Sequence, residues 1–197
     1  MLAAARRSIC DMSEHLSEHL SEHLSEHGAG MDPAERPARM PRTGSERELL
    51  QGWLDTHRQT LRWKASNLGL DQLLQSSVAP SGLTLLGLVR HMAECERGWF
   101  QVAAAGRSLP DLYPSPDGDL LGADREHAEA DLLTYEAAVA AADEVLASVD
   151  LDAVVRMPAT GERVAVRWIW LHMIEEYARH NGHADLLRER IDGATGD

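Results

Sequence analysis

The chain has 197 residues, a length that suits one domain or one domain with a tail. Its 32 Asp and Glu residues outnumber its 19 Lys and Arg residues, and the net charge is -13 with histidine neutral. This acidity argues against a protein that binds nucleic-acid phosphates, because such a protein needs a clustered cationic face. The hydrophobic fraction of 44% is enough for a packed core.

Cysteine usage and the absence of long apolar runs indicate the compartment. The two cysteines, Cys10 and Cys95, are too few for a disulfide framework, which predicts a reducing environment. The opening residues MLAAARRSIC lack the apolar run of about 7–15 residues that a signal peptide needs after its charges. No segment approaches the roughly 20 apolar residues that span a bilayer. We therefore expect a cytoplasmic protein with no membrane partner.

Residues 1–44 differ in composition from the rest of the chain. Residues 13–27 read SEHLSEHLSEHLSEH, and the segment after them is rich in Gly, Pro and Arg. Because such sequence cannot bury enough apolar surface to fold, we predict a low-complexity, disordered extension over residues 1–44. Met12, Met31 and Met40 are alternative start positions, so the assigned start could lie too far upstream.

Residues 45–197 have the pattern of a helical domain. Ser45 and Glu48 match a capping box, in which each side chain satisfies the free backbone N–H of the other residue. Apolar residues then recur at helical spacing in four long segments, at about 45–68, 84–106, 124–149 and 166–191. Four long helices without a convincing strand pair predict an all-α protein with the architecture of a four-helix bundle.

The connections between these helices are also predictable. A short helical turn is expected over 71–75, and a Pro- and Asp-rich loop covers 109–119. Residues 157–165 are predicted to form a loop or a tight hairpin. Gly193 is the expected stop residue of the last helix.

The last helix carries two polar side chains in its apolar stripe. Glu176 and His180 lie four residues apart, on the same face as Ile169 and Met173. An unpaired charge against a bundle core costs several kcal/mol of desolvation, so these groups need compensation. A divalent cation provides it, and imidazole with carboxylate suits zinc better than nickel or iron.

A third candidate ligand is His91, at the border of the apolar stripe of the second long helix. His91, Glu176 and His180 together would make a three-ligand site with one position open to water or substrate, as in catalytic zinc centres. Spacing alone leaves other choices open, because His180 and Glu176 each have a second histidine nearby and each group also fits a hydrogen-bonded core position. The competing or additional polar groups are His57, Cys95, His172 and His183.

Two segments resemble a known family. SGLTLLGLVRHMAECERGWF (81–100) and VRWIWLHMIEEYARHNGHADLLRERIDGATG (166–196) are similar to the DinB-like metalloprotein superfamily, in particular to its actinobacterial DUF664, or mycothiol-transferase-like, branch. The likeness extends from about residue 46 to the C-terminus. It implies a bundle in up-down-down-up order with a metal at one end of the core. The family pattern implies His91, Glu176 and His180 as the metal ligands.

The resemblance also implies a chemistry. Zinc, or another divalent metal such as nickel, would hold the sulfur of mycothiol as a thiolate, which attacks a small electrophile in detoxification or stress response. The related mycothiol-dependent maleylpyruvate isomerase carries a second C-terminal domain, whereas this chain stops soon after the last helix, so we expect S-transfer. A metal-dependent hydrolase and a non-catalytic metal-binding bundle are the alternatives. The expected partners are a low-molecular-weight thiol and an electrophile; a homodimer remains open.

Overall fold

The computed structural model describes residue 37 and residues 39–195. Regular structure begins at Glu46, directly after the predicted capping residue. The disordered extension predicted over residues 1–44 lies, apart from residue 37 and residues 39–44, outside the described residues, and so does its SEHL repeat.

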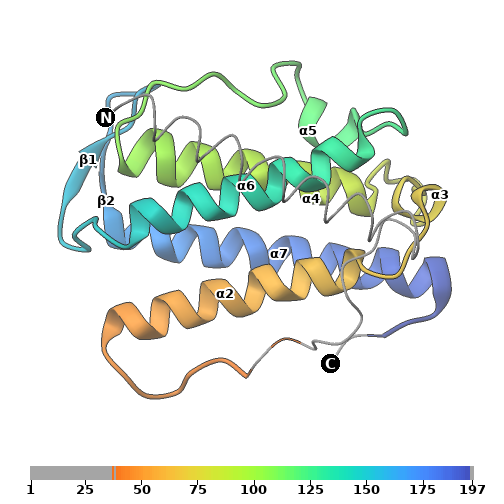
Figure 1. The fold of residues 1–197 in the computed structure, drawn as a ribbon, viewed down its shortest axis with the longest axis horizontal. Coiled ribbons are helices and arrows are strands. Elements are labelled where there is room, and N and C mark those ends of the chain that lie inside the picture. The colour runs from red at the N-terminus through yellow and green to blue at the C-terminus, as the bar shows by residue number, and fades with distance from the viewer. Residues whose placement is uncertain (1–36, 38, 196–197) are drawn as a thin grey trace, which may run out of the picture.

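Four long helical units form the bundle. They are α2 (Glu46–Ala65), α4 (Leu85–Cys95) with its direct continuation η1 (Glu96–Ala104), α6 (Ala128–Leu146) and α7 (Val166–Asp192). The helices α2 and α7 run in one direction, and α4 and α6 run in the opposite direction (Figure 1). The order along the chain is therefore up, down, down, up, and the predicted all-α bundle is confirmed.

The long crossover between η1 and α6 follows from this order, because α4 and α6 are parallel. The chain returns along one side of the bundle and forms the short helix α5 (Gly118–Leu121) on the way (Figure 1). Helix α2 packs against α7, α6 packs against α4 and η1, and α7 also contacts α4 and η1. The seam between α4–η1 and α7 is the part of the bundle that carries the polar groups described below.

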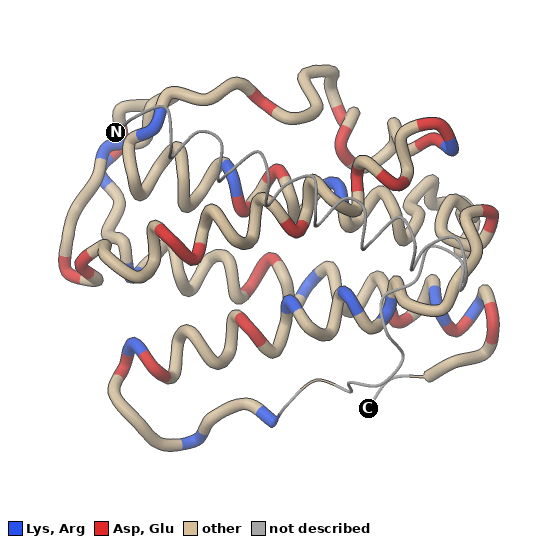
Figure 2. The backbone as a smooth tube through the Cα atoms, in the orientation of Figure 1, with Lys and Arg blue, Asp and Glu red and all other residues tan. Residues whose placement is uncertain are grey.

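All units contribute apolar side chains to one core. Completely buried examples are Leu54 and Leu61 in α2, Leu88 and Met92 in α4, Phe100 in η1, Ala142 in α6, and Ile169 and Met173 in α7. Charged residues stay mostly outside this core, and Figure 2 shows Asp and Glu spread along the length of the bundle. Within the described residues, no helix combines the length and apolar character needed to cross a membrane.

The predicted helix ends agree with the structure where a local hydrogen bond defines them. Ser45 and Glu48 form the expected capping box at the start of α2. The Thr84 side chain accepts a hydrogen bond from the Gly87 N–H and caps α4. Gly193 ends α7 with a φ of 78°, a left-handed conformation that glycine adopts without steric cost.

Three elements differ from the simple helical prediction. From Glu96 the second long helix widens into a π-helix, in which the Ala105 N–H donates to the Phe100 carbonyl five residues back. The third helix begins at Ala128 and not near residue 124, because the Asp124 carboxylate accepts a hydrogen bond from the His127 N–H before the helix starts. The region after α6 contains a short antiparallel hairpin that flanks the predicted 157–165 turn. Its strands are β1 (Val154–Arg156) and β2 (Arg163–Ala165).

The short helical turn predicted over 71–75 is present in the structure as the short helix α3 (Leu70–Leu73).

A buried ionic network links all four units at mid-bundle. Arg58 on α2 is 1% exposed and donates to both carboxylate oxygens of the fully buried Glu96, each at 2.7 Å. The Tyr177 hydroxyl on α7 donates to the same carboxylate at 2.7 Å and lies 3.1 Å from the Tyr135 hydroxyl on α6. Arg58 also donates to Asp143 at 2.7 Å. Because an unpaired charge would be costly here, this network fixes the relative positions of the helices.

Candidate metal centre

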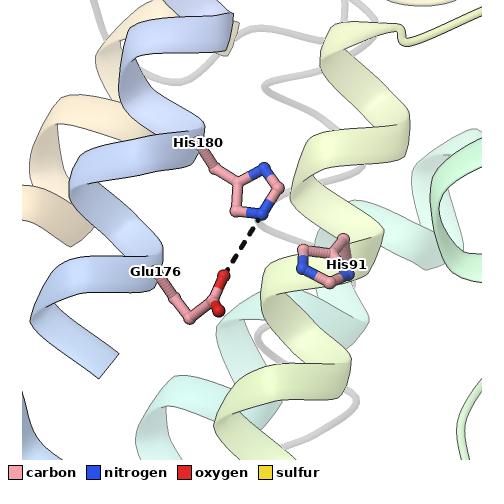
Figure 3. Close-up of side chains that lie close together, drawn as sticks. All are labelled: His91, Glu176 and His180. Carbon is pink, nitrogen blue, oxygen red and sulfur yellow. Dashed lines mark ion pairs between the residues drawn. The ribbon is translucent and has the colours of Figure 1, made fainter. Parts of the chain in front are cut away.

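The seam between α4 and α7 brings together the three side chains that the sequence singled out. His91 projects from α4, and Glu176 and His180 project from consecutive turns of α7 (Figure 3). One ligand atom from each of the three lies within 4.8 Å of the other two. The structure therefore places these three residues around a common point, and His91 faces inward as the sequence analysis expected.

The three groups sit between the apolar core and water. The His180 Nε2 atom lies 3.3 Å from Glu176 Oε2, and the centroids of the His91 and His180 rings are 4.5 Å apart. The exposed fractions of the side chains are 19% for His91, 13% for Glu176 and 9% for His180. Burial lowers the pKa of His180 to about 4, with a further contribution from the neighbouring imidazoles. His180 is therefore neutral at neutral pH, the form that binds a metal.

An aspartate that the sequence analysis did not single out orients His91. The Asp119 Oδ2 atom on α5 accepts a hydrogen bond from His91 Nδ1 at 2.7 Å. A carboxylate can only accept, so Nδ1 carries a proton, and the neutral imidazole with this tautomer has its lone pair on Nε2. This carboxylate–histidine arrangement is typical of metal-binding imidazoles.

The local structure of α4 holds Asp119 in place. Arg90, the residue before His91, donates to the backbone carbonyls of Gly118 at 2.7 Å and Asp119 at 3.1 Å. A Cβ atom at Gly87 would lie 2.2 Å from the Leu120 carbonyl oxygen, so glycine at this position allows α5 to approach α4. The Pro- and Asp-rich loop noted in the sequence contains this helix start, but composition alone does not select Asp119 from the other aspartates.

His180 also has an outer partner, His183. Their Nδ1 atoms are 3.4 Å apart, so one ring can donate to the other. With the proton on His180 Nδ1, the Nε2 atom that faces Glu176 has a free lone pair. His183 thus lies behind the site and not among its inward-facing groups.

Arg179 neutralises the second oxygen of Glu176. Its guanidinium donates to Glu176 Oε1 at 3.0 Å and also pairs with Glu175. His172 approaches the same oxygen, with Nε2 at 3.7 Å. His172, Glu175 and Glu176 form a second group with ligand atoms within 4.8 Å of one another, but the arginine already supplies a cation there.

A comparison with protein families identifies the family of this chain. The family model described as mycothiol S-transferase matches residues 49–193. The chain belongs to the mycothiol S-transferase family. A search of curated proteins and a search of solved structures gave no significant match.

The family match covers all but the first three residues of the bundle and includes all of the site residues, with Asp119 in the crossover among them. The mycothiol-transferase-like resemblance of the two sequence segments is thereby confirmed. Within the family domain, the donor set itself indicates which metal would fit. Two imidazole nitrogens and one carboxylate suit zinc, and three protein ligands leave a position for an exogenous sulfur or oxygen.

Cys95 and His57, the remaining candidates, stand outside this set. The Cys95 Sγ atom lies 3.5 Å from His91 Nε2, but it is not among the mutually close ligand atoms. Burial, together with the charges of Glu176 and Asp119, raises the pKa of the Cys95 thiol, so the thiol stays protonated. His57 on α2 contacts Asn181 instead, whose amide donates to the His57 carbonyl at 3.0 Å.

Proposed function

We propose that this member of the mycothiol S-transferase family is a zinc-dependent enzyme whose metal is held by His91, Glu176 and His180. The observation that carries the proposal is the convergence of the three donor atoms within 4.8 Å, on a seam between two helices. The outer contacts of Asp119 and His183 support it, because each is suited to leave one imidazole nitrogen free for a ligand bond. Nickel would fit the same donors less well.

A bound divalent metal would supply one thing, a lowered pKa of the coordinated thiol of mycothiol, so that the nucleophilic thiolate exists near neutral pH. The chain's own residues prepare the site for it. Asp119 holds the His91 proton on Nδ1. Arg179 occupies the spare oxygen of Glu176. Cys95, kept as a thiol by its raised pKa, does not compete as a nucleophile.

The proposed reaction joins the thiol sulfur to an electrophilic carbon. The thiol releases its proton to water, the sulfur lone pair forms the new C–S bond, and the leaving group departs with the electron pair of its bond to carbon. In a conjugate addition no group leaves, and the carbanion takes a proton from water. The product is a mycothiol thioether, which gives the reaction a role in detoxification. We place it in the cytoplasm, where low-molecular-weight thiols are kept reduced.

Elemental analysis and a thiol-consumption assay on the purified full chain test the proposal together. We expect zinc in the purified protein, and mycothiol consumption with 1-chloro-2,4-dinitrobenzene that a strong chelator abolishes. His180→Ala should lose most of the zinc and the activity, whereas the control His57→Ala should retain both. Unchanged zinc stoichiometry in His180→Ala would refute the ligand assignment. Ester hydrolysis that needs no thiol would instead favour a metal-dependent hydrolase.

A further inference from the structure

Four side chains form a continuous row along α7, each four residues after the last. The rings of Trp168 and His172 are stacked, with centroids 4.9 Å apart and planes 8° from parallel. His172 Nε2 lies 3.7 Å from Glu176 Oε1, and Glu176 Oε2 lies 3.3 Å from His180 Nε2. The row therefore connects an aromatic end to the candidate metal centre without a break.

Trp99 on η1 completes the aromatic end from the opposite side of the seam. Its ring meets His172 edge-on, with centroids 4.5 Å apart, and its centroid lies 5.7 Å from that of Trp168. His91, the α4 group of the metal centre, is eight residues before Trp99 on the same continuous helical unit. Both sides of the seam thus carry an aromatic end and a metal-binding end. We call Trp99, Trp168 and His172 the aromatic platform.

Exposure to solvent falls steadily from the platform to the metal centre. Trp168 is 48% exposed, whereas the side chain of His172 is 20% exposed, that of Glu176 13% and that of His180 9%. Trp168 differs in this respect from the other large aromatic residues of the helix, Trp170 and Tyr177, which are fully buried. The platform is therefore the solvent-facing end of a seam that leads inward to the ligands.

The separation of the two ends decides what the platform can hold. Trp168 precedes Glu176 by eight residues, which is about 12 Å along an α-helix at 1.5 Å per residue. A small electrophile must touch the sulfur during reaction, so it cannot rest on Trp168 at the same time. The part of mycothiol that lies farthest from its sulfur can rest on Trp168 during the reaction. Mycothiol carries its sulfur on an N-acetylcysteine joined to two successive six-membered rings, glucosamine and inositol.

We propose that the aromatic platform binds the glucosaminyl-inositol part of mycothiol while its sulfur lies at the metal centre. This inference rests on the proposed function and names the subsite for the thiol. The C–H faces of a sugar or cyclitol ring are apolar and pack against an exposed indole, which offers a large rigid apolar surface. Glu175 and Arg179, each 51% exposed and paired with each other on the same helix, offer polar groups to the ring hydroxyls with little net charge. A neutral polyol suits this pair, because its hydroxyls need hydrogen-bonding partners and it carries no charge.

Kinetics with two thiols test the inference on the holoenzyme. N-Acetylcysteine has the same reacting group as mycothiol but no rings. We expect Trp168→Ala to raise the KM for mycothiol about tenfold, the effect of losing one stacked ring. The KM for N-acetylcysteine and the KM for 1-chloro-2,4-dinitrobenzene should not change. Trp168→Phe should restore part of the mycothiol affinity, and zinc content and melting temperature confirm that each variant folds and holds metal.

Trp53 provides the matched control, since it is 41% exposed on α2 and lies outside the platform. Trp53→Ala should leave every KM unchanged. An equal rise in KM for both thiols in Trp168→Ala would overturn the inference, and so would a rise in the KM for the electrophile, which would assign the platform to the second substrate.

A binding measurement separates failure of the inference from failure of the proposed function. By calorimetry, S-methylmycothiol should bind the wild-type protein more tightly than S-methyl-N-acetylcysteine, and Trp168→Ala should remove most of that difference. If the two ligands bind wild type equally, the platform does not hold the rings, even when turnover proceeds. If the difference is present but no thiol is consumed, the subsite stands and the proposed transferase activity fails.

Discussion

The Asp119 carboxylate accepts a 2.7 Å hydrogen bond from His91 Nδ1 across 28 residues of sequence. The contact joins the crossover between η1 and α6 to the candidate metal centre. It gives the crossover a chemical role in addition to its topological one, because it fixes both the tautomer and the orientation of the only α4 side chain among the three proposed ligands. The strength of metal binding should therefore depend on a residue that does not touch the metal.

Asp119→Ala should lower the affinity for zinc about 10- to 100-fold, the usual cost of losing an outer carboxylate partner. Competition with a chromophoric chelator measures this affinity directly. Asp111→Ala, an exposed change in the same loop, is the control and should leave zinc affinity unaltered. Equal zinc affinities for Asp119→Ala and wild type would show that the contact does not serve a metal.

Gly87→Ala should disturb the same contact from the side of α4. The added methyl group would meet the Leu120 carbonyl oxygen at 2.2 Å, so α5 must move away. We expect a loss of about 1–3 kcal/mol in the free energy of unfolding, typical of overpacking, together with weaker zinc binding. At Gly98, also inside a helix, a Cβ atom would have no neighbour within 4 Å, so Gly98→Ala should not destabilise the protein in urea denaturation and should gain about 0.4–1 kcal/mol. An unchanged free energy of unfolding in Gly87→Ala would show that α5 is free to shift.

Arg58→Met should be among the most damaging single changes in the bundle. It leaves the completely buried Glu96 carboxylate without its cation, and breaking such a pair costs about 3–5 kcal/mol of unfolding free energy. Arg62→Met is the matched comparison, since Arg62 and Glu136 are partly exposed, and a pair of that kind contributes about 0–1 kcal/mol. Denaturant titrations of both variants give the two values. Similar losses of unfolding free energy in the two variants would mean that burial does not make the Arg58–Glu96 pair more costly to break.

Cys95→Ser should retain zinc. The Cys95 sulfur is close to His91 Nε2 but does not belong to the group of mutually close donors. Elemental analysis of the variant checks this, and release of zinc on this substitution would make Cys95 a ligand.

Local sequence signals predicted much of this fold, and the limits of that prediction have physical reasons. The capping boundary at Ser45 and the stop at Gly193 depend on residues within one turn, so they are readable from the sequence. The stripe containing Glu176 and His180 follows from helical periodicity. The π-helical hydrogen bonding after Glu96 does not, because its apolar residues still fit an α-helical stripe.

The candidate site shows the same division. Helical periodicity predicted that His91 and His180 face inward. Residue spacing could not choose the ligands among the neighbouring histidines, and only the family pattern favoured the proposed ligand set. The sequence did not predict the role of Asp119. Its approach to His91 depends on the path of a long crossover and on the absence of a side chain at Gly87.

The stability of the protein stripped of metal should fall as the pH drops from about 6.5 to about 4, in part because of His180. Burial lowers the folded-state pKa of His180 to about 4, whereas the imidazole of the unfolded chain has its ordinary value of 6.5. Between these two values the unfolded state binds a proton that the folded state does not, so protons favour unfolding. The contribution is absent above the unfolded value and complete below the folded one.

Urea denaturation of the chelator-treated protein at pH 7 and at pH 4.5 measures this effect. His180→Gln cannot take up the proton, so it should lose less stability than wild type between the two pH values, while the carboxylates contribute equally to both. His127→Gln is the control for a histidine outside the site: the pKa of His127 is raised by its hydrogen bond to Asp124, which is the opposite direction. If His180→Gln and wild type lose the same stability on acidification, His180 is not held neutral by its surroundings, and its readiness to bind a metal must have another origin.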